Sequence, residues 1–122
     1  MGLPTTERFI AATEQELGLA LPEWLRARLL RENGGTVEAA GDYWELFSVF
    51  DTTDRKHITR STTNIVRETS SARSWVGFPP SAIAIARNGG DDYLILLRGE
   101  GATAHIWRHG TDAPPVPVGV SS

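Results

Sequence analysis

The positions of glycine and proline limit what this chain can fold into. Leu21-Pro22, Asn33-Gly34-Gly35, Gly77-Phe78-Pro79 and Asn88-Gly89-Gly90 separate its apolar segments from one another. Glycine and proline at such places mark stops of regular backbone and carry no chemistry of their own. A chain of 122 residues can bury roughly two-thirds of the surface that its unfolded form exposes, so it needs no disulfide to fold. We therefore predict one domain over residues 1–122, without internal repeats or a dividing linker.

Three helices are predicted from helical spacing of apolar residues. Residues 6–17 form an amphipathic pattern that stops at Gly18. A second helix takes Pro22 as its first helical residue, because proline lacks the N–H that would have no partner there, and ends at Asn33-Gly34-Gly35. A middle helix over residues 64–73 begins after a cap at Thr62 or Thr63. Residues 51–61, between the second and third helices, are polar and read as a loop.

Strands are predicted in the middle and in the last third of the chain. Residues 43–50 are dense in aromatic and β-branched side chains, and residues 83–86, 93–98 and 104–107 form a meander joined by glycine-rich turns. Pro114, Pro115 and Pro117 are expected to end regular structure, so that residues 110–122 form a proline-rich tail. The fold class predicted is α+β, with two N-terminal helices and a middle helix on a mainly antiparallel sheet.

Charge is distributed unevenly along the chain, whose net charge is −3. Residues 55–73 contain five cations and one acid, whereas residues 32–54 contain no lysine or arginine and six acids: Glu32, Glu38, Asp42, Glu45, Asp51 and Asp54. A nucleic-acid binder normally has a basic face that no acidic block offsets, so direct nucleic-acid binding is disfavoured. The acidic block suits a basic protein partner, because complementary charge speeds encounter. The alternative is that these acids lie on a solvated surface of loops and strands and bind no partner.

No arrangement of residues indicates catalysis or metal binding. His105 and His109 are four residues apart, but in a strand this spacing separates them by about 13 Å, too far to share a metal. Asp91 and Asp92 follow two glycines and are expected to be turn residues rather than an acid–base pair. The chain has no cysteine and none of the HExxH, P-loop or nucleophile-elbow motifs. We predict a protein that is not an enzyme and uses no cofactor or metal.

The sequence also predicts the cellular location of the protein. No apolar run reaches the roughly 20 residues of a spanning helix, and no signal peptide is recognisable, so we expect a cytoplasmic chain that starts at its own N-terminus and has no membrane partner.

Tryptophans supply much of the packing area of a small core and also anchor interfaces. For Trp44 and Trp107 we favour the core, whereas for Trp75 the two interpretations are even.

The order of these segments resembles the SUKH superfamily, which is named after fungal Smi and Knr cell-wall regulators and the bacterial Syd protein. The resemblance covers residues 7–109 and is carried by Leu21-Pro22, Asn33-Gly34-Gly35, Trp44-Glu45-Leu46-Phe47, Gly77-Phe78-Pro79, Ile83-Ala84-Ile85-Ala86, Asn88-Gly89-Gly90-Asp91 and Trp107-Arg108-His109. It implies helices packed against a sheet. For stand-alone bacterial members it implies an immunity protein that binds and neutralises a cognate toxin, often a nuclease, while other members are regulatory interaction domains.

The chain departs from the family after its last motif. Members commonly continue into a C-terminal helix, whereas this chain passes into its proline-rich tail. Part of the sheet or of the N-terminal helical layer would then be uncovered, and a homodimer is one expected way of covering it.

The resemblance and the acidic block together predict an immunity-type binding protein that occludes a cognate toxin, with a basic nuclease as one candidate partner. The predicted partner-binding residues lie in the acidic segment of residues 38–54: Glu38, Asp42, Trp44, Glu45, Asp51 and Asp54. Reversal of Glu45 and Asp51 to lysine is predicted to slow association and to leave folding intact. The alternatives are a regulatory interaction domain without a toxin and a module that binds a small ligand in an apolar pocket.

Overall fold

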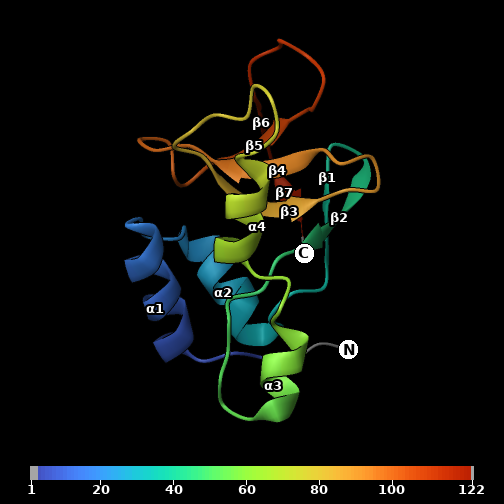
Figure 1. The fold of residues 1–122 in the computed structure, drawn as a ribbon. Coiled ribbons are helices and arrows are strands. Elements are labelled where there is room, and N and C mark those ends of the chain that lie inside the picture. The colour runs from blue at the N-terminus through green and yellow to red at the C-terminus, as the bar shows by residue number, and fades with distance from the viewer. Residues whose placement is uncertain (1–2, 122) are drawn as a thin grey trace.

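Helices gather at one end of the molecule and strands at the other. The computed structural model describes residues 3–121, so residues 1, 2 and 122 of the predicted domain lie outside the described part. In Figure 1, α4 crosses in front of the sheet, and the other helices lie below it. The predicted α+β class is confirmed. The elements in chain order are α1 (Glu7–Leu17), α2 (Glu23–Arg31), β1 (Thr36–Ala39), β2 (Asp42–Leu46), α3 (Arg55–Arg60), α4 (Ile65–Ala72), β3 (Ile83–Arg87), β4 (Tyr93–Leu96), β5 (Ala104–Trp107), β6 (Val116–Val118) and β7 (Val120–Ser121).

The two N-terminal helices begin and end within a residue or two of where the sequence predicts. Helix α1 buries Phe9 and Ile10 and ends at Gly18, whose φ of 68° is the left-handed conformation that glycine adopts without steric cost. Pro22 caps α2 in an extended conformation and is not its first helical residue, which corrects the predicted role of this proline by one position. Helix α4 also begins one residue late, because the side chain of Asn64, and not that of Thr62 or Thr63, accepts from the backbone N–H of Arg67.

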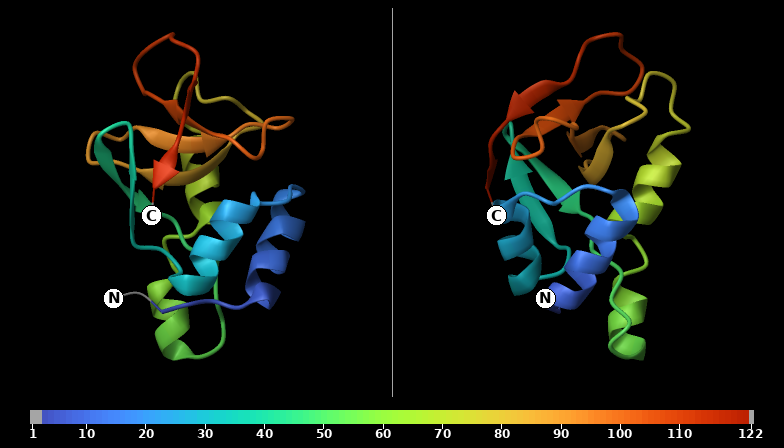
Figure 2. Two further views of the ribbon diagram at one scale, coloured as in Figure 1. Left: turned by 180° about the vertical axis from the view of Figure 1, so that it is seen from behind. Right: turned by 90° about the vertical axis from the view of Figure 1, so that its left-hand side faces the viewer.

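All pairs in the sheet are antiparallel, and the sheet is nearly closed. Its strand order is β6-β5-β4-β3-β2-β1-β7, so β6 and β7, which follow one another in the chain, pair with opposite ends of the sheet. Figure 2 shows the C-terminal segment running from one side of the sheet to the other. The tail therefore occupies the edges that β1 and β5 would otherwise present to solvent.

This closure corrects the prediction that prolines end regular structure in a tail over residues 110–122. Pro117 lies within β6, opposite His105 of β5. A proline is tolerated there because β6 pairs with a neighbour on one side only, so the missing N–H removes no bond from the interior of the sheet. The expectation of a homodimer assumed an uncovered sheet edge, and the chain itself fills this edge. The dimer stays an untested prediction.

The structure contains two elements in the middle of the chain that the sequence analysis missed. Strand β1 forms a hairpin with β2, and the turn residues Ala40 and Gly41 have φ values of 52° and 74°, as in a tight two-residue turn. Helix α3 lies inside residues 51–61, so the predicted loop is wrong. The predicted strand over residues 43–50 is correct as far as Leu46, and the backbone N–H of Phe47 still donates to Ile85.

The hydrophobic core is continuous from the helices into the curled sheet. Trp44 and Trp107 are 1% and 2% exposed, which confirms their predicted place in the core. Trp107, Tyr93 and Phe78 form a cluster of tilted and edge-on rings beneath the link that follows α4. The same core supports the inner face of the β1–β2 hairpin.

Candidate functional site

The β1–β2 hairpin has one buried face and one exposed face. Val37 and Trp44, which face each other across the two strands, are buried. Glu38 opposite Tyr43, and Thr36 opposite Glu45, point the other way, because successive side chains of a strand alternate between its two faces. Tyr43 is 68% exposed. We call these four exposed residues, Thr36, Glu38, Tyr43 and Glu45, the hairpin face.

Both glutamates of the hairpin face are without a partner in the described part of the chain. The side chains of Glu38 and Glu45 make no hydrogen bond or ion pair with any of residues 3–121. Arg87 lies opposite Glu45 in the sheet register, but its guanidinium contacts Glu68 at 3.4 Å. The two carboxylates are therefore available to an external group, next to an exposed aromatic ring.

Glu45 stands between two open hollows. One, of about 510 Å³, reaches toward α3, and the other, of about 420 Å³, reaches toward the β3–β4 turn. Thr36 and Glu45 line both of them. Glu32 and Arg60 also line the first hollow, and Arg87 and Asp91 the second, so each offers carboxylates beside one guanidinium. The surface around Glu45 is thus uneven and mostly polar, with room for side chains of another protein.

The loop before β1 is held by Asn33. Its side chain donates to the carbonyl of Val49 and accepts from the N–H of the same residue, both at 2.9 Å. Gly35 has a φ of 86°, which favours glycine, and a Cβ there would lie 2.6 Å from the carboxylate of Glu32, which would have to move. The Asn33-Gly34-Gly35 motif is therefore structural: it ties the start of the hairpin to the segment that follows β2.

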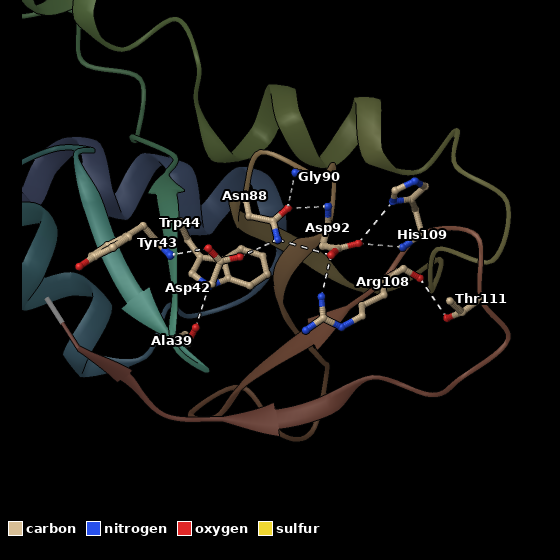
Figure 3. Close-up of polar contacts among 10 residues, drawn as sticks. All are labelled: Ala39, Asp42, Tyr43, Trp44, Asn88, Gly90, Asp92, Arg108, His109 and Thr111. Atoms are coloured by element: carbon tan, nitrogen blue, oxygen red, sulfur yellow. Dashed lines mark hydrogen bonds and ion pairs between the residues drawn. The ribbon is translucent and has the colours of Figure 1, made fainter.

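A polar network holds the turn of the hairpin in place. Figure 3 shows Asn88 at its centre, between Asp42 of the hairpin and Asp92 of the β3–β4 turn. The Asn88 amide donates to Asp42 at 3.1 Å, and its oxygen accepts from the backbone N–H of Asp92 at 3.0 Å. Asp92 then accepts from Arg108 at 2.7 Å. In the same view Tyr43 projects away from this network, toward open surface.

Asp42 is exposed, but its carboxylate is hydrogen-bonded within the protein. One of its carboxylate oxygens accepts from the backbone N–H of Tyr43 at 2.8 Å, and the other from Asn88. Asp42 therefore positions the hairpin, whereas Glu38 and Glu45 are unengaged.

The structure contradicts the prediction for two of the six candidate residues. Trp44 and Asp51 are each 1% exposed, so neither offers surface to a partner. The indole N–H of Trp44 donates to the carbonyl of Ala39 at 3.0 Å inside the core. Asp51 accepts from the hydroxyls of Thr5 at 2.8 Å and Thr53 at 2.6 Å, and from the Thr53 N–H at 2.9 Å.

Asp51 is consequently a structural carboxylate. Burial raises its pKa, but the hydrogen bonds from Thr53 and Thr5 act in the opposite direction and together leave the pKa below its ordinary value. Replacing Asp51 with lysine would bury a cation next to hydroxyl groups that now donate to an anion. Contrary to the expectation from the sequence, we therefore predict that this reversal destabilises the fold.

Asp54 is exposed and caps α3. Its carboxylate accepts from the backbone N–H of His57 at 2.9 Å and contacts the His57 ring at 2.7 Å. These hydrogen bonds from His57 lower the pKa of Asp54. Asp54 belongs to the start of α3 and is separate from the hairpin face.

The histidines and the paired aspartates are held in structural roles. His105 is buried, and its Nδ1 lies 3.2 Å from the Thr103 carbonyl, whereas His109 contacts Asp92 at 3.3 Å. Asp91 adopts a left-handed φ of 61°, as expected of a turn residue. Within residues 3–121 no group of three or more histidine, aspartate and glutamate side chains is arranged to hold a metal ion.

Tyr43, like Thr36, is a residue of the hairpin face that the six predicted positions omit. The signal for it is the alternation of the strand: once Trp44 is placed inward, Tyr43 must point outward. The second missing feature is β1, which brings Glu38 beside Tyr43.

The fold and this surface define a small α+β domain with an exposed acidic hairpin. The chain belongs to the SMI1/KNR4 family (SUKH-1), whose model matches residues 4–119, and the resemblance to the SUKH superfamily is thereby confirmed. Comparison with curated proteins and with solved structures gave no match. Among the helices described, none is long and apolar enough to cross a lipid bilayer.

Proposed function

We propose that this protein is an immunity-type binding protein that neutralises a cognate bacterial toxin by covering it with the hairpin face. Domains of this family are generally immunity or binding proteins rather than enzymes. The observation that carries the proposal is the 68% exposed ring of Tyr43, flanked by two glutamates that no other described residue engages. An exposed aromatic side chain with a charged surround has the composition of a binding hot spot.

The mechanism is occlusion, which needs no reacting group on this chain. The Tyr43 ring supplies the apolar contact, and Glu38 and Glu45 attract a positively charged partner and exclude acidic ones. The network around Asn88 and the core beneath Trp44 hold the hairpin in its bound shape before the encounter, which lowers the entropic cost of association. A basic nuclease fits this charge. Since the chain has no cysteine to form a disulfide, we propose that it acts in the cytoplasm.

The experiment pairs this chain with the product of the gene adjacent to its own. Cells that express that product should stop growing, and coexpression of this chain should restore growth. Tyr43→Ser should weaken binding by about 30-fold, the usual effect of truncating an aromatic anchor, and should abolish protection.

The control is Glu16→Lys. Glu16 is exposed on α1, outside the hairpin face, so this variant should protect as the wild type does. Two results would remove the immunity function: an adjacent gene product that is harmless in cells, or full protection by Tyr43→Ser. Binding to a harmless product would instead favour a regulatory interaction domain.

A further inference from the structure

A second surface, formed by helices, contains an apolar groove. Phe50 and Ile58 are 44% and 38% exposed, and both line one hollow of about 410 Å³ together with Val66. Thr13 and Glu16 of α1 form one wall, and Arg67 of α4 belongs to the other. In the right-hand view of Figure 2, α1 lies beside the segment that runs from α3 to α4. We call this hollow the helical groove; it has no lining residue in common with the hairpin face.

The cations without a partner are concentrated beside this groove. The sequence has twelve lysines and arginines, and most of those in the described part contact a carboxylate, a carbonyl or a ring. The side chains that make no such contact with residues 3–121 all belong to α3, to α4 or to the residue that caps α4: Arg55, Lys56, Arg67 and Arg73.

One of these cations lines the groove, and a second lies on the same face of α3 as one of the lining residues. Arg67 is one of its lining residues. Arg55 precedes Ile58 by three residues in α3, and residues three apart lie on the same face of a helix. An apolar floor of three side chains therefore has unpaired guanidinium groups at its margin. The opposite sign of charge distinguishes it from the hairpin face.

We propose that the helical groove binds an acidic amphipathic segment of another protein. The apolar side chains of such a segment would cover Phe50, Ile58 and Val66, and its carboxylates would pair with Arg67 and Arg55. Arginine suits this role because its planar group binds carboxylates through two parallel hydrogen bonds. A nucleic acid fits less well, because three apolar side chains line the groove and Arg67 is the single cation among its lining residues.

The probe is a fluorescein-labelled peptide of about 14 residues, with leucines at the i, i+3, i+4 and i+7 positions of a helix and glutamates elsewhere. Its comparison is a scrambled peptide of the same composition. Fluorescence anisotropy with the full chain should give a Kd of about 10 μM for the amphipathic peptide and a value at least about tenfold weaker for the scrambled one.

Variants locate the binding. Ile58→Ser should weaken it about tenfold and Arg67→Ala about fivefold, because each removes a group that lines the groove. Arg73→Ala is the matched control, since it removes another unpaired cation at the end of the same helix that does not line the groove, and its Kd should be unchanged. Thermal unfolding shows whether Ile58→Ser keeps the fold. Arg67→Ala tests the same groove by changing an exposed side chain.

Several results would overturn the proposal. The first is equal affinity for the two peptides, and the second is an equal loss of affinity in Arg67→Ala and Arg73→Ala. The third is no binding of the amphipathic peptide up to about 1 mM protein. Displacement of the peptide by a single-stranded oligonucleotide at lower concentration would assign the groove to nucleic acid instead. Concentration-dependent dimers that Ile58→Ser abolishes would assign it to a second copy of this chain. None of these results bears on the hairpin face, which has its own partner and variants.

Discussion

Asp51 provides the sharpest test of how this structure assigns roles to the acidic residues. The sequence places it among surface carboxylates, whereas the structure buries it with three hydrogen bonds to Thr5 and Thr53. Thr5 is itself buried, so water cannot replace its bond to the carboxylate. Asp51 thus joins the segment before α1 to the segment before α3, and its loss should destabilise the fold.

The size of the effect follows from these contacts. A hydrogen bond to a buried charged group contributes about 2 kcal/mol, and the bonds from exposed Thr53 contribute about 0.5 kcal/mol each because water competes for them. Asp51→Ala should therefore lower the free energy of unfolding by about 3 kcal/mol. Asp51→Asn keeps the volume but removes the charge and one acceptor, and should lower it by about 1.5 kcal/mol.

The effect of Asp51→Asn should depend on pH. The pKa of Asp51 in the folded protein lies below its ordinary value of 3.8, so the ionised carboxylate stabilises the fold at any pH above that value. This stabilisation is lost as the pH falls below 3.8 and through the folded pKa, because the native carboxylate then becomes protonated. The difference between wild type and Asp51→Asn should be full at pH 7 and should shrink toward pH 3.

Urea unfolding followed by tryptophan fluorescence measures this difference, since Trp44 is buried and should report its exposure. The Asp51→Ala midpoint should fall by roughly 1.5 M at pH 7. Asp54→Asn is the control, because Asn caps a helix as well as Asp does and little change is expected. An unchanged midpoint for Asp51→Asn at pH 7, or a loss that persists undiminished to pH 3, would refute this reasoning.

Three further predictions concern the fold. Ala40 has a left-handed φ of 52° in the hairpin turn, so Ala40→Asn should raise the free energy of unfolding by about 0.5 kcal/mol in thermal unfolding, and a lower melting temperature would count against the turn described. Trp44→Phe removes the indole hydrogen bond and leaves a small cavity, so chemical unfolding should show a loss of about 2 to 3 kcal/mol; a loss under 0.5 kcal/mol would contradict its core position. Truncation after Ala113 removes β6 and β7 and exposes two sheet edges, so light scattering should detect aggregation, whereas a stable monomer would show that the tail is dispensable.

Local signals were enough to predict α1, α2, α4 and the strands β2 to β5. Helix α1 has regular apolar spacing and a glycine stop, and β4 is a short apolar run between two turns. The missed elements lack such signals. Strand β1 is only four residues with one glutamate, and α3 is a polar helix with no buried residue, so neither has the periodicity that burial imposes. The tail forms strands because distant edges of the sheet need partners, which no local pattern reveals.

The candidate surface was predictable in position but not in its individual residues. The acidic block of the sequence includes the β1–β2 hairpin, and Glu38 and Glu45 are exposed on it. Asp51 belongs to the same block yet is buried, because its partners Thr5 and Ser61 come from segments that only the fold brings together. Strand alternation points Tyr43 outward once Trp44 is placed in the core, but only β1 and its register show that Glu38 lies beside Tyr43.

The most direct test of the central claim is the association rate of this chain with its partner as a function of ionic strength. The double variant Glu38→Lys/Glu45→Lys should bind at least about tenfold more slowly than wild type at low salt, and its rate should lose most of the salt dependence. Glu16→Lys, which reverses one charge on α1, should keep the steep dependence. An unchanged rate and salt dependence in the double variant would contradict the claim that the hairpin face binds the partner.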